Sequence, residues 1–117
     1  MIANVLILAV AALHFYFMYL EMIAWDTPAG RKAFSLTPEF ATASKGLAAN
    51  QGLYNGFLAA GLLWGVYLGD AGLQMKVFFL ICIVIAGLFG GLTVSRKILF
   101  VQALPAMVAL VVLVAWG

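Results

Sequence analysis

Four long runs of apolar residues, separated by short polar stretches, dominate the pattern of the chain. A helix that crosses the hydrocarbon core of a bilayer needs about 20 apolar residues. The runs are continuous and do not alternate between apolar and polar positions, which excludes a transmembrane β-barrel. The pattern therefore predicts an all-α membrane protein, a bundle of four transmembrane helices in a single domain over residues 1–117. The four predicted spans cover residues 2–25, 47–68, 75–95 and 98–116.

The first connection, residues 26–46, contains a helix start. Thr37-Pro38-Glu39 offers a capping hydroxyl, a proline for the first turn and an acid at the positive end of the helix. Two alternatives follow for the second span. Either one helix runs from about Pro38 to Leu68, or a short surface helix breaks at Gly46.

The basic residues of the connections predict the orientation of the helices. Cytoplasmic connections carry an excess of lysine and arginine. The first connection has three such residues, the third has two, the second has one and both terminal tails have none; in that order they are Arg31, Lys32, Lys45, Arg96, Lys97 and Lys76. We therefore expect the first and third connections, including the loop 26–46, to face the cytoplasm, with both termini outside.

The composition excludes several classes of protein. Hydrophobic residues make up 67% of the chain and charged residues 9%, whereas a soluble domain carries roughly 25% charged residues. The net charge is only +2, too little for a surface that follows nucleic-acid phosphates.

We expect the first span to persist in the mature protein instead of being removed as a signal peptide, because no basic residue precedes it and Glu21 lies within it.

Two ionisable side chains share one face of the first span. His14 and Glu21 are seven residues apart, which places them about 20° apart around a helix and about 10 Å apart along it. They cannot bond each other directly at that separation. Either another group lies between them, or each has its own partner on another helix.

The second span carries the densest polar cluster in the chain. Polar side chains in lipid are costly, so the members of this cluster cannot all face the lipid. They lie in the inner half of their span, as do Glu21 in the first span and Gln102 in the fourth. The depth they share predicts a polar, ligand-binding chamber that is closed outward and opens toward the cytoplasm or the inner leaflet. The cluster consists of Asn50, Gln51, Tyr54 and Asn55.

Proline and glycine positions predict local features of the packing. Pro105 cannot donate a hydrogen bond to the carbonyl of Val101, so the fourth helix should kink or leave an acceptor free beside Gln102.

Small residues spaced by four let another backbone approach closely. We expect such contacts, between spans or between copies in a homo-oligomer, at Gly52 with Gly56 and at Gly87 with Gly91.

Three functions fit these residues, and the sequence leaves open whether the protein is an enzyme. The first is a cofactor-free acid–base enzyme of the isomerase, cyclase or epoxide-opening type, acting on a small hydrophobic or amphipathic substrate. Glu21 and His14 would then be the catalytic acid and base, and the five polar residues that bind the substrate would be Asn50, Gln51, Tyr54, Asn55 and Gln102. The others are an accessory or assembly subunit of a membrane complex and a small proton-coupled transporter that uses Glu21.

Structural explanations of the same residues also stay open. Glu21 can extend to the lipid headgroups or pair with a basic residue of the first connection, Arg31, Lys32 or Lys45. The amide cluster can serve to hold helices together. We expect no metal site, because His14 has no second histidine or cysteine at ligand spacing.

Several stretches together resemble a family of small bacterial integral membrane proteins known only as a domain of unknown function. The resemblance extends along nearly the whole chain and is most specific in the amide-rich stretch. It implies a four-helix protein of the bacterial inner (plasma) membrane, crossing it several times, and it implies no activity. The matching stretches are His14 with Tyr19-Leu20-Glu21-Met22, Asn50 to Leu62, Gly87 to Thr93, and Gln102-Ala103-Leu104-Pro105.

Overall fold

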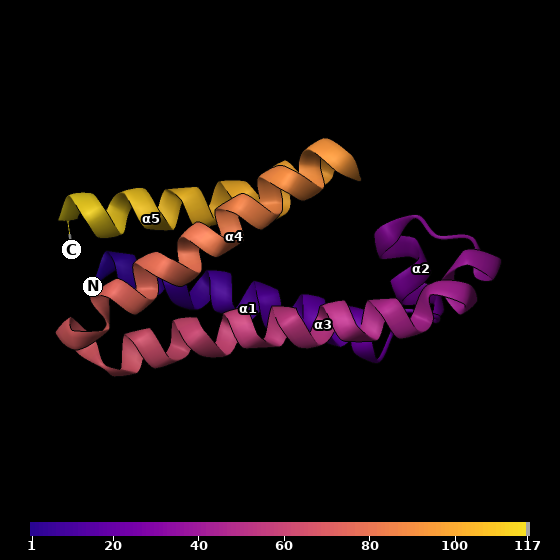
Figure 1. The fold of residues 1–117 in the computed structure, drawn as a ribbon, viewed down its shortest axis with the longest axis horizontal. Helices are drawn as coiled ribbons and strands as arrows, with labels where there is room; N and C mark the ends of the chain where they lie inside the picture. Colours follow the sequence, from indigo (N-terminus) through magenta and orange to yellow (C-terminus); the bar gives the residue numbers. More distant parts are fainter. Residues whose placement is uncertain (117) are drawn as a thin grey trace. The chain divides into compact units, whose positions relative to one another are not determined.

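The computed structural model describes residues 1–116, and within that range every regular element is a helix. The all-α fold class is thereby confirmed. Three segments are long and apolar enough to cross a membrane, namely Ile2–Met22, Gly69–Thr93 and Leu99–Trp116. The elements in chain order are α1 (Ile2–Met22), α2 (Pro28–Phe34), α3 (Pro38–Tyr67), the 3-10 turn η1 (Gly69–Gly72), α4 (Leu73–Thr93), the π-helical turn η2 (Leu99–Ala103) and α5 (Leu104–Trp116) (Figure 1).

The remaining predicted span, 47–68, belongs to a longer helix, α3. This helix runs without a break from Pro38 to Tyr67, so the first of the two alternatives for this region is confirmed. Its start is as predicted, since the Thr37 hydroxyl accepts a hydrogen bond from the backbone N–H of Phe40 at 3.2 Å. Its 30 residues make it about 45 Å long, more than the hydrocarbon core requires.

A short helix, α2, lies inside the segment predicted as a connection. Thr27 caps it by accepting a hydrogen bond from the N–H of Gly30 at 3.4 Å, and Pro28 occupies its first turn. This is the same Thr-Pro pair that starts α3 at residues 37–38. The helix ends at Ser35, whose φ of 55° is left-handed and turns the chain toward α3.

The chain divides into two compact units. One comprises Met1–Ala11 together with the chain from Ala60 onward, and the other comprises Ala12–Ala59. In the first unit, α4 and α5 run side by side in opposite directions (Figure 1). They touch at Gly87, where a Cβ atom would lie 2.6 Å from the backbone nitrogen of Ala103. The expected close approach at Gly87 therefore occurs within the chain.

The helix is irregular just before Pro105, and the irregularity takes the form of a widened turn. Because it has no N–H group, the helix cannot form the regular bond to the carbonyl of Val101. The turn before it widens into η2, in which the N–H of Leu104 bonds to the carbonyl of Leu99, five residues earlier. Gln102 lies in this widened turn.

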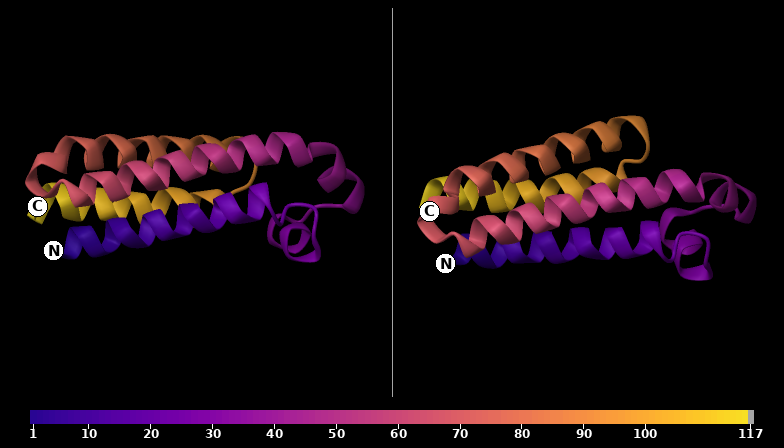
Figure 2. Two further views of the ribbon diagram at one scale, coloured as in Figure 1. Left: turned by 90° about the horizontal axis from the view of Figure 1, so that it is seen from below. Right: turned by 60° about the horizontal axis from the view of Figure 1, so that its bottom comes forward.

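In the second unit, the later part of α1 runs beside the earlier part of α3, and α2 joins them at one end (Figure 2). The closest approach is at Gly52 of α3. A Cβ atom there would lie 2.7 Å from Cγ of Met22 and 3.1 Å from the backbone oxygen of Met18. Only a residue without a side chain lets the two helices come this near, and this approach positions the site described next.

Candidate functional site

Glu21 of α1 is bonded to two amide side chains of α3. Its side chain is buried, with 3% of the residue exposed. Oε2 accepts a hydrogen bond from Nε2 of Gln51 at 2.7 Å, and Oε1 accepts one from Nδ2 of Asn55 at 2.5 Å. Both carboxyl oxygens therefore have an amide donor, and three predicted site residues are brought together.

Helix geometry explains why these three residues meet. Gln51 and Asn55 are four residues apart on α3, so their side chains emerge from one face, one turn apart. Gly52 lies next to Gln51, and a Cβ atom on it would lie 3.0 Å from Cβ of Glu21. The missing side chain at Gly52 therefore lets the Glu21 carboxyl sit within hydrogen-bond reach of both amides.

Among residues 1–116, no lysine or arginine forms an ion pair with Glu21. Arg31, which was one of the predicted partners, instead pairs with Asp26, with Nη1 3.0 Å from Oδ1. Glu21 is also too deeply buried to extend toward headgroups. Both structural alternatives for Glu21, the ion pair and the extension to the membrane surface, are therefore wrong.

The amide side chains of Gln51 and Asn55 differ in their exposure. Asn55 is buried, with 9% of the residue exposed, whereas Gln51 is exposed. Oε1 of Glu21 is thus bonded to the buried amide and Oε2 to the exposed one. The Gln51 side of the cluster is therefore the side nearer the surface.

His14 lies two turns before Glu21 on α1 and is fully buried. Its ring contacts the ring of Phe17 edge-on, with centroids 5.2 Å apart. Glu21 has partners of its own on α3, which is one half of the second arrangement predicted for this pair. A partner of His14 on another helix, the other half, stays a prediction. A direct role of His14 beside Glu21 stays a prediction.

The other predicted ligand-binding residues are not bonded to Glu21. Asn50 and Tyr54 are exposed on α3, and the Tyr54 ring packs against that of Phe57 with centroids 6.1 Å apart. Gln102 belongs to the other unit of the chain. Within residues 1–116, no three His, Cys, Asp or Glu side chains gather where they would hold a metal ion.

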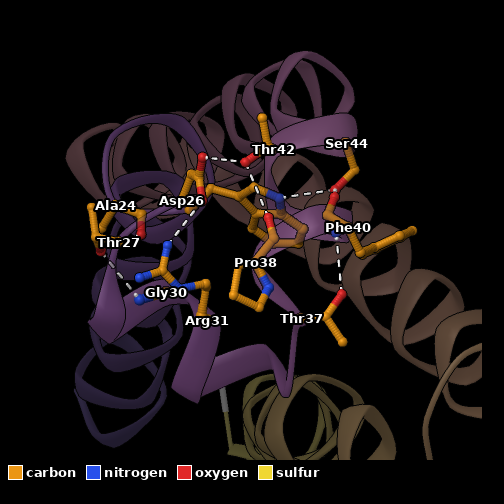
Figure 3. A network of polar contacts seen from close by, with 11 residues as sticks. Ala24, Asp26, Thr27, Gly30, Arg31, Thr37, Pro38, Phe40, Thr42 and Ser44 are labelled. Carbon is orange, nitrogen blue, oxygen red and sulfur yellow. Dashed lines mark hydrogen bonds and ion pairs between the residues drawn. The ribbon is translucent and has the colours of Figure 1, made fainter.

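A polar network holds the segment around α2 to the start of α3 (Figure 3). Asp26 accepts hydrogen bonds from Thr42 at 2.9 Å and from Arg31 at 3.0 Å. The Thr42 bond, together with the weaker effect of Arg31, lowers the pKa of the Asp26 carboxyl. Nearby, the indole N–H of Trp25 donates to the hydroxyl of Ser44 at 3.0 Å. These contacts tie the segment to α3 at two points.

Sequence reasoning missed a second polar pair, a buried lysine bonded to a half-buried asparagine. Lys76 was assigned to the second connection, but it lies inside α4 and is 5% exposed. Its Nζ atom donates to Oδ1 of Asn4 at 3.1 Å, and Gly65 makes room for its side chain. The sequence did carry a signal for this pair, because Asn4 and Lys76 are each a polar residue within an otherwise apolar run.

Within residues 1–116 the structure is that of a small, all-helical protein with three segments long and apolar enough to cross a membrane. A family model described as "Protein of unknown function (DUF1304)" matches residues 8–114, and the chain belongs to this family. The chain is also similar to "Uncharacterized protein YpaA" of Lactococcus lactis subsp. lactis (strain IL1403), with 35% identity over 109 residues that cover 92% of each chain. These matches confirm the predicted resemblance. No solved structure matches the chain.

Proposed function

We propose that Glu21, Gln51 and Asn55 form a ligand-binding site at which the Glu21 carboxyl gives up or takes up a proton. The observation that supports this is a buried carboxyl group with an amide donor at each oxygen and no lysine or arginine of residues 1–116 in an ion pair with it. Ionisable groups are expensive within a membrane and are therefore retained mainly where a function requires them. A purely structural contact between α1 and α3 would need no ionisable group.

The proposed chemistry is cofactor-free proton transfer on a small hydrophobic or amphipathic substrate, of the isomerase, cyclase or epoxide-opening type. Glu21 acts as the acid or base. The exposed amide of Gln51 can turn its N–H toward an oxygen of the substrate and stabilise charge that develops there. Asn55, which is buried, keeps the carboxyl in place. His14, Asn50 and Tyr54, which belong to the same unit of the chain, complete the proposed chamber.

We further propose that residues 47–68 of α3 form the fourth span, with both termini outside a bacterial inner membrane. This segment is less apolar than the other spans because Asn50, Gln51 and Asn55 interrupt it, and these include the two residues that bind Glu21. The position of Lys76 supports the orientation. With Lys76 inside α4, the turn η1 holds no lysine or arginine, as an external connection should. Reporter fusions after Ser35, Gly69 and Arg96 test it, since the middle one alone should report an external location.

Mass spectrometry of an organic extract of the protein, purified in nanodiscs, tests the proposed site. Wild type is compared with Glu21→Gln and Asn55→Leu, and Glu39→Gln and Gln74→Leu serve as controls because both residues are exposed and lie outside the site. A single molecular species retained near one per chain by wild type and both controls, and lost from the two site variants, is expected. The same bulk lipid in all five samples would contradict the proposal and favour an accessory-subunit role.

A further inference from the structure

The charges around Glu21 suggest which kind of molecule the proposed site binds. When ionised, the carboxyl carries a full negative charge, but Gln51 and Asn55 are neutral and offset it only as dipoles. A buried charge without a counter-charge is costly. Of the lysines and arginines in Ala12–Ala59, Arg31 is held by Asp26, and Lys32 and Lys45 are exposed on α2 and α3. No lysine or arginine of this unit therefore supplies the missing counter-charge.

We propose that the ligand at Glu21 is a cationic amphiphile, an ammonium group on an apolar body. The inference rests on the proposed function and specifies its substrate class. The ammonium group supplies the counter-charge that the two amides lack. An anionic molecule would be repelled by the carboxylate, and a neutral one would leave the charge uncompensated.

The route to the carboxyl fits such a molecule. The Oε2 side of Glu21 lies nearer the surface than the Oε1 side, because Oε2 is bonded to the exposed Gln51 and Oε1 to the buried Asn55. Tyr54 follows Gln51 by three residues, hence on the same side of α3. The Tyr54 ring is paired with that of Phe57, and these residues are 55% and 56% exposed. Aromatic faces attract cations, and their apolar bodies can also accommodate an alkyl tail.

The test compares three probes of one chain length: dodecyltrimethylammonium, dodecanol and dodecyl sulfate. Equilibrium binding is measured to the full chain in phosphatidylcholine nanodiscs, with empty nanodiscs as the baseline. We expect wild type to bind the ammonium probe at about one per chain, and neither of the other two above the baseline. Glu21→Gln should weaken ammonium binding by about tenfold or more, whereas Glu39→Gln should leave it unchanged. Tyr54→Leu should weaken it about two- to fivefold, and Tyr54→Phe much less, because the ring supplies the attraction.

The outcomes separate this inference from the proposed function beneath it. If dodecanol binds as tightly as the ammonium probe, and Asn55→Leu abolishes both, the site exists but the cationic class is wrong. If no probe binds above the baseline, the cationic class is again overturned. In that case, mass spectrometry of the organic extracts of wild type and variants decides separately whether a ligand-binding site exists at Glu21. Equal ammonium binding by wild type and Glu21→Gln would also overturn the inference.

Discussion

The amide of Asn55 donates to Oε1 of Glu21 from 34 residues away in the chain, and both residues are buried. This bond joins α1 to α3 within one compact unit. It also gives the carboxyl a fixed partner on its buried side. The proposed function depends on this pair, and its energetic importance can be measured first.

Asn55→Leu should lower the free energy of unfolding by about 1–3 kcal/mol, because it leaves Oε1 of Glu21 buried without its donor. Unfolding by sodium dodecyl sulfate in mixed micelles measures this change. Asn50→Leu makes the same substitution at an exposed position of the same helix, and it should change stability by no more than about 0.5 kcal/mol. Equal losses in the two variants would show that the Glu21 bond contributes nothing specific.

Gly52→Ala should separate α1 from α3 and weaken both bonds to Glu21. The added Cβ atom would lie 2.7 Å from Cγ of Met22, closer than such atoms come to each other, and 3.1 Å from the backbone oxygen of Met18, which is tighter than an ordinary contact. Overpacking of this kind costs about 1–3 kcal/mol. Gly46→Ala is the control on the same helix, since nothing lies within 4 Å of the new atom. It should stabilise α3 slightly, and a loss of stability equal to that of Gly52→Ala would argue against the close approach.

The network around Asp26 should loosen in acid. The Thr42 hydrogen bond and Arg31 lower the pKa of Asp26 in the folded protein, below the ordinary value of about 3.9. The ionised group therefore stabilises the segment above that value, and the stabilisation is lost as the pH falls through the lowered pKa. Trp25 fluorescence, in a variant carrying Trp64→Phe and Trp116→Phe, should report this change. Asp26→Asn should abolish the transition, and its persistence would assign it to another group.

Loss of Asn4 and loss of Lys76, the half-buried and the buried partner of one hydrogen bond, should change the stability of the protein unequally. Asn4→Leu leaves a buried ammonium group without its acceptor and should cost about 3 kcal/mol. Lys76→Met keeps the aliphatic stem and removes the charge, so it should change stability by about 1 kcal/mol or less. The double variant should resemble Lys76→Met. The reverse order of the two single variants, in the same unfolding assay, would contradict the assigned hydrogen bond.

The sequence predicted the helices better than it predicted the contacts between them. The start of α3 at Thr37-Pro38 and the irregular turn before Pro105 follow from local rules, because each depends on a cap or on a missing N–H. Residue spacing alone placed His14 and Glu21 on one face. Thr27-Pro28, at the start of α2, carried the same signal of a helix start as Thr37-Pro38.

Partner choice could not be predicted, because it depends on how one helix is rotated and shifted against its neighbour. Gln51 and Asn55 reach Glu21, while Asn50 and Tyr54 of the same cluster stay exposed. The close approach of α1 and α3 at Gly52 determines which face of α3 meets Glu21. The bond between Lys76 and Asn4 joins residues 72 positions apart. The sequence alone does not show that two residues so far apart along the chain are partners.

Isotope-edited infrared spectroscopy of Glu21 tests the central claim, that a bound molecule meets this carboxyl group, most directly. Protein labelled with 13C at glutamate side chains and stripped of bound molecules is mixed with a lipid extract of its host membranes. Wild type and Glu39→Gln should show a change in the glutamate carboxyl bands that Glu21→Gln lacks. No change in wild type, or the same change in Glu21→Gln, would contradict the claim and leave Glu21 as a structural contact between α1 and α3.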